Sequence, residues 1–192
     1  MEKEHLNILK FTPFEAKHFQ NGTSVQVYPL DNDFKITDGD ISRIVSICNQ
    51  KPIYNFLFAK RLKGEPYMDN SATGFIEWAR TGWETGKYFV FLARDNEGKI
   101  VGAVDIKSDN VDGAEVGYWM DENSPGYMSN TVRGLVEHSR DVGFKKLIAF
   151  TLPNNDKSQR VLLRAGFNHI GQEAHVDDDG TVHERFEVNL VV

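Results

Sequence analysis

The chain has 192 residues, 40% of them hydrophobic and 11% aromatic, which is enough to bury one core in a single domain. Its formal net charge of −6 argues against nucleic acid or an anionic membrane as the main partner. The single cysteine, the lack of a signal peptide and the lack of any apolar run near the roughly 18 residues of a membrane helix lead us to expect a cytoplasmic protein.

Taken in chain order, residues 1–22 are the least structured part, and we expect an N-terminal arm that packs on the domain or is partly flexible. Residues 23–192 should form the domain itself. A first strand is predicted over 24–30, and a helix with an apolar stripe should begin near Asp38 or Asp40.

A second helix is predicted from the capping residues 69–71 to Gly86, because Phe75, Ala79 and Trp83 recur four apart. The spacing of the apolar residues then changes from that of a helix to that of strands. Residues 87–107 hold two β-rich runs around the turn sequence "DNEG", and residues 114–120 should add a third strand.

From there the pattern alternates between helix and strand. A helix is expected over 129–143, a strand over 146–151, and a short helix with Asp156 at its cap and Gly166 just past its last turn. Two more strands, joined by the turn "DDDG" at 177–180, end the chain.

This order predicts an α/β (α+β) fold in one domain. Strands of a meander pair antiparallel, whereas a strand–helix–strand crossover makes its two strands parallel. We therefore expect a twisted, mostly antiparallel sheet with one parallel pair, flanked by helices.

Two loops between strand and helix carry more polar detail than a connection needs. One, before residue 129, contains Gly126, and the other contains Asn155 and Ser158. Both should lie at the same ends of adjacent parallel strands, where backbone N–H groups at helix starts can bind an anion. The blander alternatives are an ordinary turn at Gly126 and an ordinary helix cap at Ser158.

These residues resemble the GNAT N-acetyltransferases, and within them the RimJ and RimL type of ribosomal-protein N-terminal acetyltransferases. The resemblance covers roughly residues 24 to 190. It rests on Gly117-Tyr118-Trp119, the run "GYMSNTV" from Gly126 to Val132, and the later Asn155, Ser158, Gly166 and Phe167.

The resemblance implies a single-domain GNAT fold and acetyl-coenzyme A (acetyl-CoA) as acyl donor. It places the pyrophosphate of acetyl-CoA on the loop Pro125, Gly126, Tyr127, Met128 and Ser129. It places the pantetheine arm beside Trp119, Met120 and Asp121, with Asn155 holding a pantetheine amide or the incoming amine.

The loop departs from the family pattern at two positions. Asn123 replaces the usual Arg or Gln, and Pro125 removes one N–H donor. Losing one charge-assisted hydrogen bond lowers affinity by about ten- to a hundredfold, so binding should weaken rather than vanish. Nearby basic residues could compensate at the phosphates: Arg133, Lys157, Arg160 or Arg164.

Acetyl transfer to an amine requires a base, oxyanion stabilisation and a proton for the departing thiolate. By its place in the motif, Ser158 is the proposed proton donor. The base is either Glu115 on the strand 114–120 or Asp177, which lies near where RimL-type enzymes place a carboxylate. The alternative to a catalytic role is a solvent-facing strand residue for Glu115 and a hairpin-turn residue for Asp177.

The expected function is therefore an N-acetyltransferase that moves an acetyl group from acetyl-CoA to a primary amine, a protein N-terminus or a small amine, in a ternary complex. Cys48 lies on an apolar helix face, which disfavours an acyl-enzyme. The histidines lack metal-ligand spacing, so no metal is expected. The competing hypothesis is a GNAT-fold module that binds CoA with weak or no catalysis, and the protein is expected to be a monomer or homodimer.

Overall fold

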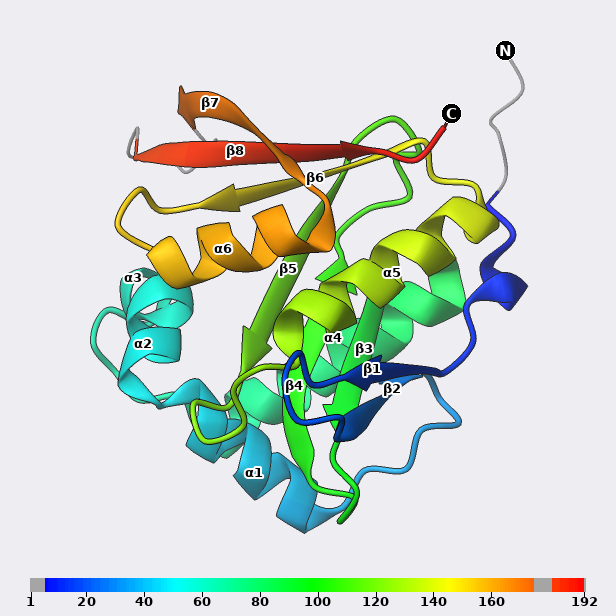
Figure 1. Ribbon diagram of the computed structural model, residues 1–192. Coiled ribbons are helices and arrows are strands. Elements are labelled where there is room, and N and C mark those ends of the chain that lie inside the picture. Colours follow the sequence, from blue (N-terminus) through cyan, green and yellow to red (C-terminus); the bar gives the residue numbers. More distant parts are fainter. Residues whose placement is uncertain (1–5, 175–180, 192) are drawn as a thin grey trace.

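The computed structural model describes residues 6–174 and 181–191, which form one eight-stranded mixed sheet with helices on both faces (Figure 1). The strands are β1 (Phe14–Lys17), β2 (Ser24–Pro29), β3 (Phe89–Arg94), β4 (Ile100–Ile106), β5 (Ala114–Met120), β6 (Lys146–Thr151), β7 (Asn168–Ala174) and β8 (Val182–Asn189). The helices are η1 (Ile8–Lys10), α1 (Asp38–Cys48), α2 (Lys51–Ile53), η2 (Tyr54–Phe58), α3 (Ala59–Leu62), α4 (Asp69–Thr85), α5 (Met128–Val142) and α6 (Asp156–Ala165).

The sheet order is β1-β2-β3-β4-β5-β6-β8-β7, and β5 and β6 are its parallel pair. This confirms the mixed sheet predicted from the strand–helix–strand crossover. The last hairpin places β8, not β7, beside β6. Strands β6 and β7 therefore run in the same direction, but β8 lies between them.

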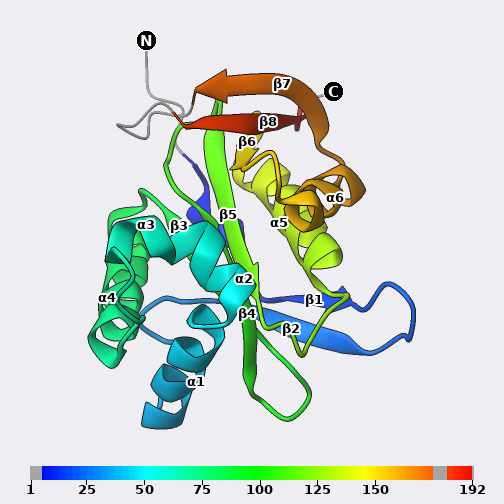
Figure 2. The same cartoon turned by 90° about the vertical axis from the view of Figure 1, so that its left-hand side faces the viewer.

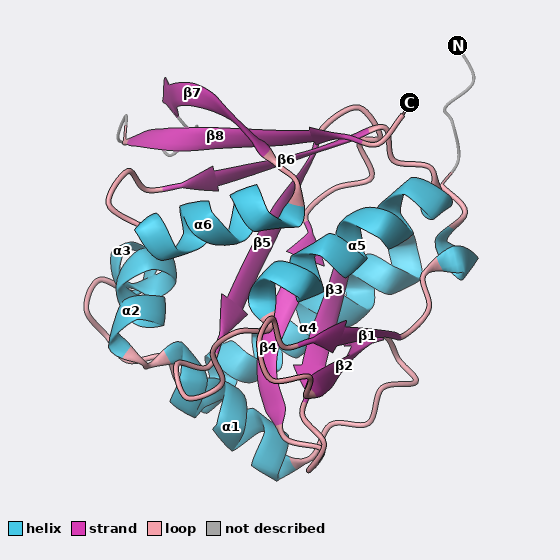
Figure 3. Ribbon diagram, in the orientation of Figure 1, coloured by secondary structure: helices cyan, strands magenta, loops and turns pink. Residues whose placement is uncertain are grey.

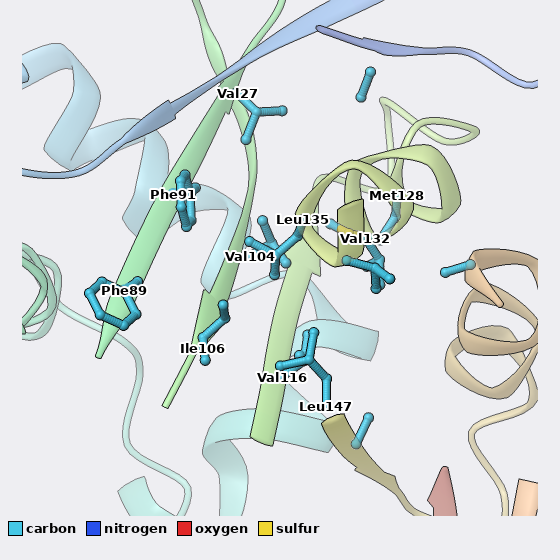
Figure 4. Close-up of a cluster of buried hydrophobic side chains, with 14 of the residues drawn as sticks. Val27, Phe89, Phe91, Val104, Ile106, Val116, Met128, Val132, Leu135 and Leu147 are labelled. Carbon is cyan, nitrogen blue, oxygen red and sulfur yellow. The ribbon is translucent and has the colours of Figure 1, made fainter. Parts of the chain in front are cut away.

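Two apolar clusters hold the helices on the sheet. Figure 2 shows α1–α4 on one side of the sheet and α5 and α6 on the other. On the α5 side, Val132 and Leu135 point toward Val104 in the cluster drawn in Figure 4, and all three are fully buried. On the other side, Ile44 of α1 and Ile76 of α4 pack in the second cluster. Burial on both faces is what makes the central strands almost continuously apolar.

The helix ends follow local chemistry. Helix α1 begins at Asp38 behind a capping box in which Thr37 and Asp40 bond each other's backbone N–H groups. For α6 the prediction of Asp156 as the cap was wrong. The cap is Asn155, whose side-chain oxygen accepts the Ser158 backbone N–H at 3.2 Å, and Asp156 is the first helical residue.

The sequence analysis did not predict η1, strand β1 or the helical stretch 51–62. Strand β1 lies within the predicted arm and pairs with β2 over four positions, with Phe14 and Ala16 buried. The helical stretch 51–62 contains η2, a π-helical turn, between α2 and α3. Such a short strand and such a widened turn carry too little periodicity to be read from sequence.

No helix within residues 6–174 and 181–191 combines the length and apolar character needed to cross a membrane.

Two glycines of α4 provide a matched test of this packing. A Cβ on Gly82 would lie 2.2 Å from the Tyr88 ring and 2.4 Å from its carbonyl oxygen, whereas a Cβ on Gly74 would meet nothing within 4 Å. Gly82→Ala should therefore lower the free energy of unfolding by about 1–3 kcal/mol. Gly74→Ala should raise it by roughly 0.5–1 kcal/mol, because alanine favours the helix. Urea unfolding of both variants measures this, and equal effects would contradict the packing.

Candidate functional site

The site begins where β5 and β6 separate. The two strands are in register at only two positions, Ala114 with Leu147 and Glu115 with Ile148, although β5 continues for five more residues. Figure 3 shows the two strands diverging beyond this point. The sheet is therefore open in its middle.

The opening exposes backbone groups of β5. Lys107 donates its N–H to the Glu115 carbonyl, and Asp121 donates to Val101, so the odd-numbered residues of β5 bond toward β4. Because an antiparallel strand alternates its bonding direction, the N–H and C=O groups of Tyr118 and Met120 point toward the gap. This edge can pair with an extended, amide-bearing ligand.

A cleft of about 500 Å³ occupies the gap. It combines residues from β5, β6, α6, the loop before α5 and the α2–η2 segment. Of the predicted site residues, its walls include Glu115, Trp119, Met120, Asp121, Pro125, Gly126, Met128, Asn155 and Ser158. The structure thus brings together nearly all of the positions singled out from the two loops. Among the described residues, Tyr127 and Ser129 do not contribute to these walls.

The start of α5 forms part of the cleft wall. The N–H of Thr131 makes the first i→i−4 bond of this helix, to Tyr127, so the N–H groups of residues 127–129 precede the helical ladder. With the positive end of the helix dipole they suit a phosphate. Lys157 also lines the cleft, whereas Arg133 donates to the Arg164 carbonyl at 2.5 Å.

Gly126 is held against the β1–β2 hairpin. It has φ +95°, and a Cβ there would lie 2.1 Å from His18 Nε2. The Phe19 N–H donates to the Gly126 carbonyl at 3.1 Å, and the Tyr127 hydroxyl lies 2.6 Å from Thr23 Oγ1. The N-terminal hairpin therefore braces the predicted pyrophosphate loop, a contact that no local sequence signal indicated.

Asp121 ends β5 as a buried anchor. Its carboxylate accepts hydrogen bonds from Gln50 at 2.6 Å and from Asn123, and it pairs with the Arg43 guanidinium. Burial alone would raise the pKa of Asp121, but these donors outweigh it and hold the pKa below its usual value. The side chains of Asp121 and Asn123 are thus engaged with the protein. The backbone of Asp121 is engaged too, because its N–H donates to Val101 and its carbonyl accepts from Ser124. The contact of Asp121 with pantetheine stays a prediction.

The hydroxyl of Ser158 faces β5 across the cleft. Ser158 Oγ lies 2.7 Å from the Tyr118 hydroxyl, which also donates to the Ser158 carbonyl at 3.1 Å. Asn155 caps α6, so the alternative of Ser158 as an ordinary helix cap does not apply. Tyr118 was noticed only as part of a motif, because the 40 residues between it and Ser158 hide their contact. Burial raises the pKa of Tyr118, so its phenol is neutral at physiological pH.

The two candidate bases fare differently. Glu115 lines the cleft and forms an ion pair with Lys107, whose side chain lines it too. Asp177 lies outside the described residues. His183 is in the cleft wall with its Nδ1 3.1 Å from the Thr181 carbonyl.

One part of the cleft wall is apolar. Pro52, Ile53, Phe56 and Leu57 line it from α2 and η2. The sequence could not separate core aromatics from cleft aromatics here: Phe56 lines the cleft, whereas Phe58 packs on Tyr67 and Trp83 on Phe89 in the core.

Cys48 is buried in the cluster beneath α1, and burial raises the pKa of its thiol to about 12. A thiol in this state is not a nucleophile at neutral pH. Across residues 6–174 and 181–191, no group of three or more His, Cys, Asp or Glu side chains could hold a metal ion.

Comparison with known proteins places this geometry in context. A family model described as "Acetyltransferase (GNAT) domain" matches residues 35–168. No curated protein sequence matches the chain.

Solved structures with the same fold are distant in sequence. Mycobacterium smegmatis RimJ in complex with CoA-disulfide is 16% identical, with a TM-score of 0.72 over 94% of this chain and 88% of that one. The Salmonella typhimurium acetyl transferase that modifies the N-terminal serine of L7/L12 is 14% identical (TM-score 0.69; 88% and 96% covered). Spermidine N-acetyltransferase from Vibrio cholerae, with CoA and spermine, is 15% identical (TM-score 0.65; 86% and 95% covered).

The anchor at Asp121 gives a pH-dependent prediction. Asp121→Asn should lower the free energy of unfolding at pH 7 by about 1.5–3 kcal/mol, because it removes charged hydrogen bonds in a buried position. The folded pKa of Asp121 is lowered, so its contribution is complete above the ordinary carboxyl pKa and disappears as the pH falls through the folded value. The deficit should therefore shrink as the pH falls below the ordinary carboxyl pKa of about 4.

Chemical denaturation across pH measures this. Asp112→Asn is the control, because Asp112 is exposed and its ion pair with Lys145 spans 3.8 Å. It should change stability by less than about 0.5 kcal/mol. A deficit at Asp121 that is independent of pH would show that the charge of this anchor is not what stabilises β5.

Proposed function

Because the chain belongs to the GNAT acetyltransferase family and is thus an acetyl-CoA-dependent N-acetyltransferase, we propose that it acetylates a primary amine by direct attack in a ternary complex. The observation that carries the proposal is the cleft between β5 and β6, whose walls combine the start of α5, with its donors for a phosphate, and apolar residues of α2 and η2. Cys48 is buried and protonated, which supports direct attack over an acyl-enzyme.

The residues present fit acetyl-CoA. The N–H groups at the start of α5 would bind its pyrophosphate, with Lys157 as an added positive charge. The cleft-facing backbone of Tyr118 and Met120 would pair with the pantetheine amides, as a strand edge pairs with a peptide. Bound in this way, acetyl-CoA supplies an activated acyl thioester.

The hydroxyls of Ser158 and Tyr118 form a proton relay in this proposal. Ser158 donates a proton to the thiolate as it departs, and Tyr118, 2.7 Å away, replaces that proton. A cleft-facing N–H of β5 stabilises the oxyanion. Asn155 positions the start of α6 through its bond to the Ser158 N–H.

The acceptor would enter past Pro52, Phe56 and Leu57. We propose a protein N-terminus or a small amine, in line with the serine N-terminus and the polyamine named for two structural neighbours. The apolar entrance suits an acceptor with a hydrophobic part next to its amino group.

Cofactor binding and acceptor choice can be tested together. Acetyl-CoA should raise the melting temperature, because a ligand that binds only the folded state stabilises it. A panel with spermidine and a tripeptide that begins with Ser should then release free CoA thiol in proportion to acetylated product. A shift in melting temperature without thiol release from any amine would favour a CoA-binding module over an enzyme.

The relay is tested by Ser158→Ala, Tyr118→Phe and the double variant. Ser158→Ala should lower kcat by about 10- to 1000-fold with nearly unchanged CoA affinity, because its proton is needed mainly in the transition state. If Tyr118 acts through Ser158, the double variant should be no slower than Ser158→Ala. Asn155→Ala should instead lower stability by about 1 kcal/mol and weaken CoA binding. Additive losses in the double variant would exclude a shared relay.

A further inference from the structure

A third carboxylate, Asp105, lies against Gly117 in the wall of the cleft. Asp105 of β4 is opposite Gly117 of β5, in a position where β3 presents the apolar Val90. Its Oδ1 atom is buried and has no hydrogen-bond partner among the described residues. A buried carboxylate oxygen without a donor is costly, so it needs a functional explanation.

The wall between this carboxylate and the cleft is a glycine. A Cβ on Gly117 would lie 2.9 and 3.0 Å from the two oxygens of Asp105, and Gly117 itself lines the cleft. The bare backbone thus leaves a window toward the carboxylate. The stem of Lys107 covers the window, with its Cε 3.0 Å from the same Cβ position.

Lys107 therefore puts a primary ammonium group near two carboxylates. Its Nζ is paired with Glu115, and its side chain is 46% exposed, on a long stem that can turn into solvent. An acceptor ammonium has the same charge and the same donors, so it can take the place of Lys107.

We propose that Asp105 is the general base of the reaction: the ammonium group of the acceptor displaces Lys107 at the Gly117 window and gives its proton to the Asp105 carboxylate. This inference rests on the proposed N-acetyl transfer and names its substrate class, an amine that arrives as a cation. Glu115 then has a different role. Its carboxylate, which pairs with Lys107, holds the ammonium group in place.

The protons balance in this scheme. The ammonium gives one proton to Asp105 and becomes a neutral amine, whose nitrogen lone pair forms the new C–N bond. The C–S bond breaks, Ser158 gives a proton to the sulfur, and the second proton of the nitrogen restores the hydroxyl relay. Asp105 returns its proton to solvent when the amide leaves.

The charge environment agrees with this role. Burial raises the pKa of Asp105 to about 6; the Lys107 ammonium and a backbone hydrogen bond from Gly117 oppose the rise, and the Glu115 carboxylate adds to it. A base with this pKa is ionised at neutral pH and still basic enough to accept a proton. Because the folded pKa is raised, ionisation of Asp105 destabilises the fold as the pH rises through about 6.

Three variants test the assignment through the pH profile of kcat/KM between pH 5 and 9. The wild type should lose activity below about pH 6, and Asp105→Asn should lose about 100- to 1000-fold in kcat/KM together with this acid limb. The limb should move to higher pH in Lys107→Met, which removes the opposing cation, and to lower pH in Glu115→Gln. Asp105→Asn should melt no lower than the wild type at pH 8, whereas a merely structural carboxylate would melt lower. Asp112→Asn should change none of these values.

An acid limb that disappears in Glu115→Gln but persists in Asp105→Asn would overturn the assignment, because Glu115 would then be the base. If no amine of the panel is acetylated, the proposed function fails. The role of Asp105 in holding an acceptor ammonium group is then tested separately, by amine binding. Calorimetry of spermidine with the CoA-saturated protein should then show at least about fivefold weaker binding to Asp105→Asn. Equal binding to both proteins, or to neither, would overturn it.

Discussion

The separation of β5 from β6 after two paired positions is the constraint on which the site depends. A fully paired strand would use the N–H and C=O groups of Tyr118 and Met120, and no cleft would exist. The lost pairing is compensated on the far side of β6, which pairs with β8 over six positions. The free end of β5 is fixed by Asp121, through Arg43 of α1 and Gln50. The opening is thus a rigid feature of the sheet, held from both sides.

Two carboxylates, the buried Asp121 just after β5 and the half-buried Asp105 of β4, show how the same residue type serves structure and chemistry. Asp121 receives donors from Gln50, Asn123 and Arg43, and its pKa is lowered. Asp105 keeps an oxygen without a donor, and its pKa is raised to about 6. The first carboxylate stabilises the fold when ionised, and the second destabilises it. Such a penalty beside a cleft is characteristic of a functional group, because selection for stability alone would remove it.

Much of the architecture was predictable because its signals are local. The alternation over 114–120 matches β5 at both ends, and the helices that begin at Asp38 and Asp69 follow apolar periodicity. A capping box precedes the first helix, whereas the N-cap of the second is Met68, whose side chain makes no cap bond, so the cap predicted at 69–71 was wrong. The parallel pair followed from the rule that a strand–helix–strand crossover makes its two strands parallel. Local signals failed at β1, which has four residues, and at the π-helical turn η2, since neither spans enough residues to show a period.

The sequence by itself determined the order of the strands and helices from residue 24 on, apart from the helical stretch 51–62. It also determined the two polar loops and the place of Cys48 in the core, because these depend on residues that are close in the chain. Only the tertiary structure decided which side chains meet in the cleft. Tyr118 reaches Ser158, and Asp105 faces Gly117, only after strands far apart in sequence are brought into register and β6 turns away. The pKa of a carboxylate likewise depends on burial and on neighbours that folding supplies, so no pattern of residue types could distinguish Asp105 from Asp121.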